Sequence, residues 1–160
     1  MDRYLLDTNF FITSEQYIPF DIFPSFWSSL AALLESGEAL IHESVMDELK
    51  RKEDELLPWL KSLNNVKPVK ASQQVLDKYL EVCNWPASKN YDSNAIKEFT
   101  ATDRADAWLC AEACVSGYVL VTYEKSSNSI KKVKIPNVCD AFGVTCIDCR
   151  NFMRKEGFKF

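Results

Sequence analysis

Four acidic residues are placed where a fold could bring them together: Asp7, Glu48, Asp106 and Glu124. Asp7 directly follows an apolar run at 4–6, and Glu124 follows another at 118–122. Because parallel strands end at the same edge of a sheet, both acids would meet where open α/β sheets bind ligands. Carboxylates gathered there stay ionised only beside a positive charge, which a divalent cation with oxygen ligands provides. The pattern predicts metal-assisted hydrolysis.

Glu48 has an acidic neighbour, Asp47, and helical geometry separates their roles. The apolar stripe of the predicted helix consists of Val45, Met46 and Leu49. Glu48 lies at the margin of this stripe, whereas Asp47 lies further round and suits a capping box with Ser44 as N-cap. We therefore expect Glu48 to face a cleft. The alternative is a surface pair between Glu48 and Lys52 at i,i+4 spacing.

Asp103 and Asp106 are three residues apart in the first turn of a helix predicted over 102–116, so both lie on one face. The same face continues with small apolar residues: Ala107, Cys110, Ala113 and Cys114. Two acids at the start of such a stripe are unusual for a surface helix and favour a functional site. The alternative is a helix cap, with Asp103 as N-cap and Asp106 as its partner, both favoured by the helix dipole.

The composition is that of one globular domain over residues 1–160, with 47% hydrophobic and 26% charged residues. No stretch approaches the ~20 apolar residues of a membrane span, so we expect no membrane partner. Only six residues precede Asp7, which leaves no room for a signal peptide and predicts a cytoplasmic protein. The net charge of −4 argues against a protein that coats nucleic acid by charge alone.

The six cysteines are expected to be thiols in that compartment. Cys146 and Cys149 form a single CxxC pair. Cys139 could be a third zinc ligand, and His42 is the only histidine. This set falls short of a persuasive structural zinc site. Basic residues form three groups, one of which follows Glu124 and could hold a phosphate backbone: 50–52; Lys125, Lys131, Lys132 and Lys134; and Arg150, Arg154, Lys155 and Lys159.

Short apolar strands alternate with helices along the chain, which is typical of βαβ units. Strands are predicted at 3–7, 39–42, 118–122 and 144–147, with a strand edge at 134–135; helices are predicted at 24–36, from 44, at 72–83, 102–116 and 136–142. Residues 53–101 form a broken helical insertion between the second and third acidic motifs. The predicted fold is a three-layer α/β/α sandwich with a central, mainly parallel sheet.

Four segments in this order resemble the PIN-domain nucleases: LLDTN at 5–9, SVMDEL at 44–49, DAWLCAEA at 106–113 and LVTYE at 120–124. The resemblance is nearest to small prokaryotic PIN proteins, which include the VapC-type toxins. It implies a PIN-like fold and a metal-dependent endoribonuclease that acts on single-stranded or structured RNA. It also implies a possible protein antitoxin and a possible homodimer as partners.

The resemblance assigns roles to individual residues. Asp7, Glu48 and Asp106 match acids that bind Mg²⁺ or Mn²⁺, and Asn9 and Thr122 match polar residues that support the site. Two departures concern the remaining acids. Glu124 stands where the family usually has Asp, and Asp103 is an extra carboxylate that could substitute or join.

Two rival functions follow from the same residues. A haloacid-dehalogenase type of phosphatase also begins with a strand ending in Asp, but it needs an acid two residues later, where this chain has Asn9. The other rival is a non-catalytic PIN-like scaffold that binds RNA or protein. In the insertion, Trp85, Lys89 and Tyr91 could stack on and steer bases, or pack as a lid.

Overall fold

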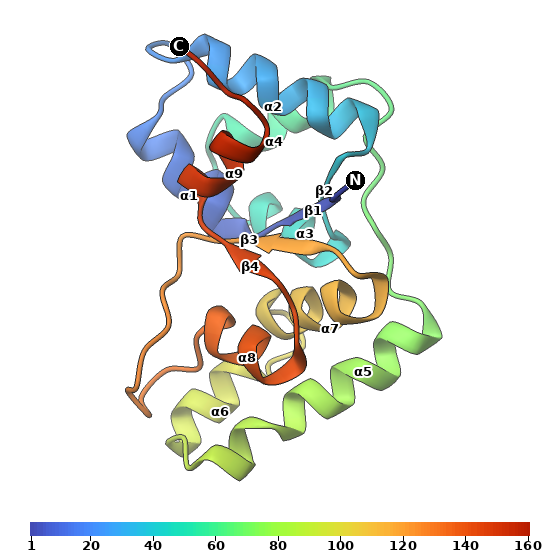
Figure 1. Ribbon diagram of the computed structural model, residues 1–160, viewed down its shortest axis with the longest axis vertical. Coiled ribbons are helices and arrows are strands. Elements are labelled where there is room, and N and C mark those ends of the chain that lie inside the picture. Colours follow the sequence, from blue (N-terminus) through green and yellow to red (C-terminus); the bar gives the residue numbers. More distant parts are fainter.

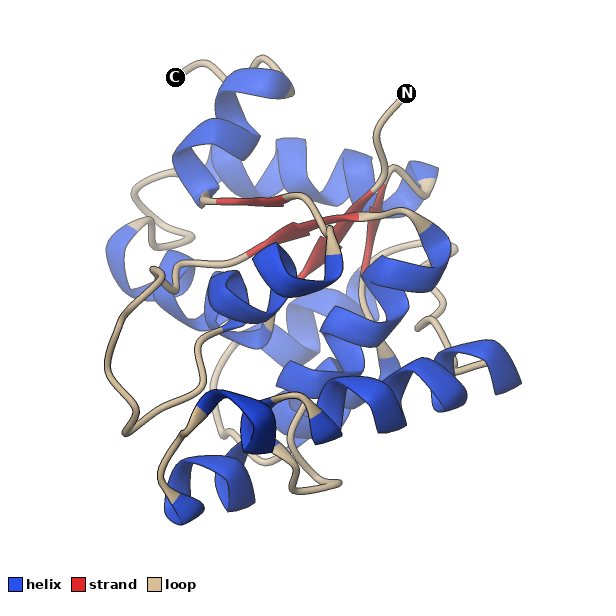
Figure 2. Cartoon of the chain, turned by 60° about the horizontal axis from the view of Figure 1, so that its bottom comes forward, coloured by secondary structure: helices blue, strands red, loops and turns tan.

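The computed structural model describes residues 1–160 and has a four-stranded sheet between layers of helices (Figures 1 and 2). The strands are β1 (Tyr4–Leu6), β2 (Ala39–Leu40), β3 (Val119–Val121) and β4 (Cys146–Ile147). They lie in the order β2-β1-β3-β4, and every pairing is parallel. The predicted three-layer α/β/α sandwich is confirmed.

The strand order places a topological switch point between β1 and β3. From β1 the chain crosses to β2 on one side of it and returns to β3 on the other side. Leu6 pairs with Val121 in the parallel register, so the residues after these two strands leave the sheet at the same level. In open α/β sheets a crevice forms at such a switch point, outside the carboxyl ends of the strands, and ligands bind there.

The helices surround this sheet, and none combines the length and apolarity needed to cross a bilayer. Their bounds are α1 Thr8–Tyr17, α2 Pro24–Ser36, α3 Glu43–Lys50, α4 Leu56–Ser62, α5 Gln73–Asn84, α6 Ser93–Phe99, α7 Asp106–Ser116, α8 Ile135–Phe142 and α9 Cys149–Lys155, with a 3₁₀ helix, η1, at Pro86–Lys89. In Figure 1, α1, α2 and α9 lie above the sheet, and α7 and α8 lie below it.

Local sequence explains the helix ends next to the sheet. Pro24 is the first residue of α2, where its missing N–H is not needed. Gly37 ends α2 and Gly117 ends α7, with φ of 81° and 73° in the left-handed region that favours glycine. Each glycine turns the chain back toward the next strand, β2 or β3.

The segment 53–101 is helical, as predicted, but it does not gather into one lobe. α4 packs against α1 and α3, whereas α5 packs along α7. Figure 1 shows α4 near α2 at the top and α5 and α6 at the bottom. Only the later part of the insertion therefore adds an outer layer beneath α7, whereas α4 packs on the other side of the sheet.

Three predicted boundaries are wrong. The N-cap of α3 is His42, whose Nδ1 accepts the Ser44 N–H at 3.1 Å, so Ser44 lies inside the helix. α7 begins at Asp106 and not at residue 102, because residues 102–105 form a turn that brings Arg104 back toward α3. Residue 135 begins α8 and is not a strand edge, since Pro136 suits the first turn of a helix.

Aromatic side chains fill the space between the sheet and the helices above it. Phe152 of α9 lies edge-on to Tyr4 of β1 at 4.9 Å and to Phe10 of α1 at 5.6 Å between ring centroids. Phe152 is fully buried. It joins β1, α1 and α9, so its volume helps to set the position of the residues after β1.

Replacing Phe152 with Ala is expected to lower the free energy of unfolding by about 3–5 kcal/mol, because a large cavity would remain. Phe160→Ala is the matched control, since Phe160 is 69% exposed, and its expected loss is below about 1 kcal/mol. Urea denaturation of both variants measures the difference. Equal losses would contradict the assignment of Phe152 to the core.

Candidate functional site

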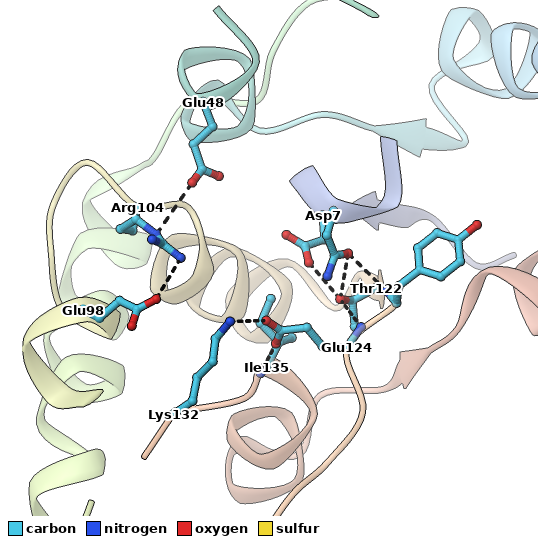
Figure 3. A network of polar contacts seen from close by, with 10 residues as sticks. Asp7, Glu48, Glu98, Arg104, Thr122, Glu124, Lys132 and Ile135 are labelled. Carbon is cyan, nitrogen blue, oxygen red and sulfur yellow. Dashed lines mark hydrogen bonds and ion pairs between the residues drawn. The ribbon is translucent and has the colours of Figure 1, made fainter. Parts of the chain in front are cut away.

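Asp7 and Thr122 meet at the switch point, one residue beyond the paired ends of β1 and β3 (Figure 3). The Thr122 hydroxyl donates to Asp7 Oδ2 at 2.8 Å. Asp7 occupies the N-cap position of α1, yet its side chain makes no capping hydrogen bond. Its carboxylate instead lines a cleft at the sheet edge, so helix capping does not account for this acid.

Asn9 and Thr122 hold the segment after β3 in place. Asn9 Oδ1 accepts the backbone N–H of Tyr123 at 3.1 Å, and the Thr122 hydroxyl oxygen accepts the N–H of Glu124 at 3.0 Å. Thr122 and Asn9 side chains also lie 3.1 Å apart. These contacts fix the backbone that presents Glu124, which suits the supporting role predicted for both residues.

Glu48 points from α3 toward the same cleft. Its Oε1 accepts the Thr8 hydroxyl proton at 2.5 Å, and its Oε2 lies 3.9 Å from Arg104 Nε. The predicted alternative, a pair with Lys52, is not the one formed. Asp47 lies in solvent and pairs with Lys50 at 3.7 Å. The prediction that Glu48 faces the cleft and that Asp47 lies further round the helix is therefore correct.

Glu124 also lies at the cleft, but its carboxylate has structural partners. Oε2 accepts the N–H of Ile135, the first residue of α8, at 2.8 Å. Oε1 lies 4.0 Å from Lys132 Nζ. Glu124 thus stabilises the start of α8, and one of its oxygens is left with only a long ion pair.

Asp106 and Asp103 separate in space. Asp106 lines the cleft at the start of α7. Asp103 precedes the helix, its side chain is 70% exposed, and it lies 4.0 Å from Arg51 Nη1. Because α7 starts after Asp103, the two acids do not share a helical turn, and the cap pair considered from the sequence does not form.

The cleft has a volume of about 510 Å³, and ten of its 11 lining residues are polar or charged. Its residues are Asp7, Thr8, Asn9, Ile12, Glu48, Arg51, Lys52, Arg104, Asp106, Glu124 and Lys132. The acidic side chains lie deep, since Glu48 and Glu124 are only 15% and 11% exposed. The basic ones lie nearer the mouth, with Arg51 51% and Lys132 44% exposed.

Burial and mutual repulsion oppose ionisation of the deepest acids. Burial raises the pKa of Asp7 well above its ordinary range, and the charge of Asp106 raises it further. The pKa of Asp106 rises to about 7, first through burial and then through repulsion by Glu124, while Arg104 acts in the opposite sense. A cation brought among these carboxylates would therefore be bound in exchange for protons.

The chemistry of the carboxylates fits a hard divalent cation, although their present arrangement does not enclose one. No group of three or more acidic, histidine or cysteine side chains is close enough to hold a metal ion as the side chains stand. Oxygen donors from Asp7, Glu48, Asp106 and Glu124 are the ligand type that Mg²⁺ and Mn²⁺ prefer. Glu48 and Glu124 would have to turn from the long contacts with Arg104 and Lys132.

The sequence indicates only some of the basic side chains that line the cleft. Arg51, Lys52 and Lys132 belong to basic groups visible in the sequence, and the one after Glu124 was expected beside the site. Arg104 precedes α7, although the helix predicted over 102–116 includes it. It lies between Glu48 and Glu98, at 3.9 and 3.4 Å (Figure 3). No sequence pattern indicates this turn.

The sulfur and imidazole groups lie apart from the cleft lining. All six cysteines are free, and Cys139 and Cys149 are buried. His42 is buried at the start of α3, with Nε2 3.9 Å from Glu112 Oε1. Glu112 is also buried, because α5 covers α7.

Asp106→Asn is expected to stabilise the metal-free protein at about pH 8 by roughly 1 kcal/mol or more. The folded protein keeps the Asp106 proton up to about pH 7, whereas the unfolded chain releases it near 3.8. The free energy of unfolding therefore falls as the pH rises through this window, and Asn removes that loss.

Urea denaturation in EDTA at about pH 5 and pH 8 measures this effect, with a smaller difference expected at the lower pH. Asp103→Asn is the control, because Asp103 is mostly exposed and is not part of the cleft. A stability change in Asp106→Asn that is independent of pH would contradict the burial of an ionised Asp106.

Comparison with known proteins adds a family. No curated protein matches the chain. The family model described as "Domain of unknown function (DUF4411)" matches residues 4–160, which include the whole sheet and every residue that lines the cleft. The chain therefore belongs to the DUF4411 family.

Proposed function

We propose that this protein is a metal-dependent endoribonuclease of the PIN type that hydrolyses phosphodiester bonds of single-stranded RNA. The observation that carries the proposal is the layered charge of the cleft at the switch point. Four carboxylates lie deep, and four basic side chains lie around them nearer solvent. An anionic substrate that reaches the acids must first pass the basic groups.

Asp7, Glu48 and Asp106 are the proposed ligands of Mg²⁺ or Mn²⁺, with Glu124 as the fourth acid. When bound, a divalent cation supplies charge stabilisation to a phosphate and acidifies water. Thr122 and Asn9 keep the Asp7 carboxylate and the backbone of Glu124 in position. Asp103 is left out of this set, because its side chain lies outside the cleft.

Arg51, Lys52, Arg104 and Lys132 are the proposed phosphate contacts. Arg51 and Arg104 offer planar guanidinium groups that can bind two phosphate oxygens at once. Arg104 Nε is buried and has no hydrogen-bond partner, although Glu48 is 3.9 Å away. A buried N–H group without a partner can donate a hydrogen bond to an anion that enters the cleft.

Cation binding requires that two ion pairs within the cleft break. Glu48 would leave Arg104 and Glu124 would leave Lys132, and each pair is long, at 3.9 and 4.0 Å. Partly exposed pairs of this length contribute at most about 1 kcal/mol each. The freed Arg104 and Lys132 would then be available to the phosphates of the substrate.

The rival is a non-catalytic scaffold, and the same ion pairs favour it. The acids of a scaffold can remain neutralised by Arg104 and Lys132, and a partner can bind without any cation. If the resemblance to the toxin branch extends to function, a protein antitoxin is the proposed partner, and a basic side chain of that partner would compete for the same acids.

Cleavage of a labelled single-stranded RNA separates these functions. Purified protein is expected to cut the RNA with Mn²⁺, and cleavage should disappear with EDTA and fall at least about a hundredfold in Asp7→Asn, because the deepest ligand is lost. Asp103→Asn is the matched control and should retain activity. Equal cleavage by Asp7→Asn and the unmodified protein would contradict the proposal.

Arg51→Ala is expected to weaken binding of single-stranded RNA and to lower the dependence of log K on log salt by about 0.7, as one phosphate contact is lost. Lys61→Ala, at an exposed site in α4 outside the cleft, is the control. Fluorescence anisotropy over a range of salt concentrations measures both slopes. An unchanged slope for Arg51→Ala would show that Arg51 does not contact phosphate.

A further inference from the structure

A second cavity, of about 280 Å³, lies between the helical insertion and the chain that follows β3. Two segments and helix α8 line it: Trp85, Lys89 and Tyr91; Ser127, Asn128, Ser129 and Ile130; Asn137 and Asp140. In Figure 1 the loop between β3 and α8 descends on the left toward α6. The cavity thus depends on the helical insertion at 53–101, which supplies one of its walls.

The loop that lines this cavity is held by its own hydrogen bonds. Asn137 clamps Ser127 twice, since its Oδ1 accepts the Ser127 N–H and its Nδ2 donates to the Ser127 carbonyl, both at 3.0 Å. The Ser127 hydroxyl accepts the Ser129 N–H at 3.1 Å, and the Ser129 hydroxyl accepts the Lys131 N–H at 3.2 Å. A loop organised in this way presents a preformed surface.

The opposite wall carries two aromatic rings. Trp85 and Tyr91 have ring centroids 5.8 Å apart and planes inclined at 53°, so the rings do not stack face to face. Both rings pack partly against the core, which limits their motion. The Asp92 N–H donates to the Ile130 carbonyl at 2.9 Å and ties this wall to the loop.

The loop also connects this cavity to the acidic cleft. It leaves the cleft at Glu124 and returns to it at Lys132. Ile130 lines the second cavity and is two residues from Lys132, so their Cα atoms are at most about 7–8 Å apart. Lys89 and Lys132 therefore offer positive charge at both ends of a path that a phosphate backbone can follow.

We infer that this cavity is a base-binding subsite for a nucleotide of single-stranded RNA whose neighbouring phosphate lies in the acidic cleft. The inference rests on the proposed function for its substrate. The base stacks on Tyr91, as bases do on aromatic side chains in proteins that bind single strands, and the inclined Trp85 ring contacts its edge. Lys89 contacts the adjoining phosphate, and Asp140 accepts from an exocyclic amino group, which favours cytosine over uracil.

Binding of fluorescent single-stranded RNA in EDTA tests the subsite without any contribution from cleavage. Tyr91→Leu is expected to weaken binding about fivefold or more, because one stacking contact is lost. Tyr17→Leu is the matched control, since Tyr17 is 75% exposed and lies outside both cavities. Lys89→Ala, paired with Lys97→Ala, provides a second comparison at exposed positions that leave the core intact.

Oligocytidine and oligouridine of equal length test the base contact. The unmodified protein should bind oligocytidine several-fold more tightly, and Asp140→Ala should remove that preference. Equal binding by Tyr91→Leu, Lys89→Ala and the unmodified protein, or no RNA binding at all, overturns the subsite. Cleavage with Mn²⁺, measured in parallel, reports on the proposed function separately: weaker binding by Tyr91→Leu supports the subsite whether or not the RNA is cut.

Discussion

The repulsion between buried carboxylates at the carboxyl ends of β1 and β3 governs the rest of the site. Burial raises the pKa of both Asp7 and Asp106, and repulsion adds to it, from Asp106 on Asp7 and from Glu124 on Asp106. Thr122 and Arg104 relieve part of this strain by a hydrogen bond and by opposite charge. Asp7 is only 3% exposed in the folded chain. Such an arrangement lowers the stability of the metal-free fold, and perturbed acids of this kind are typical of candidate functional sites.

Sequence reasoning predicted the architecture because the fold follows from short-range patterns. Apolar strands and glycine stops after α2 and α7 set the parallel sheet, and Asp7 was placed at its edge by β1 alone. Glu48 was separated from Asp47 by a helical stripe. These are local features, and the structure agrees with them at Gly37 and Gly117.

The remainder depends on tertiary packing, which a single sequence does not show. Arg104 enters the cleft because α7 starts at Asp106, a boundary that propensity alone placed four residues early. Asp103 falls outside the cleft for the same reason. Glu112 is buried since α5 covers the outer face of α7, a contact between segments far apart in the chain. The insertion also places Trp85 and Tyr91 beside the loop after Glu124.

Titration calorimetry of the metal-free protein with Mn²⁺ tests the central claim, that the buried carboxylates form a cation site, most directly. In two buffers of different ionisation enthalpy at about pH 6.5, we expect binding with release of protons, since Asp7 and Asp106 must ionise. Asp7→Asn should lose most of the affinity, and Asp103→Asn should retain it. Absence of binding, or equal binding by Asp7→Asn, would contradict the account.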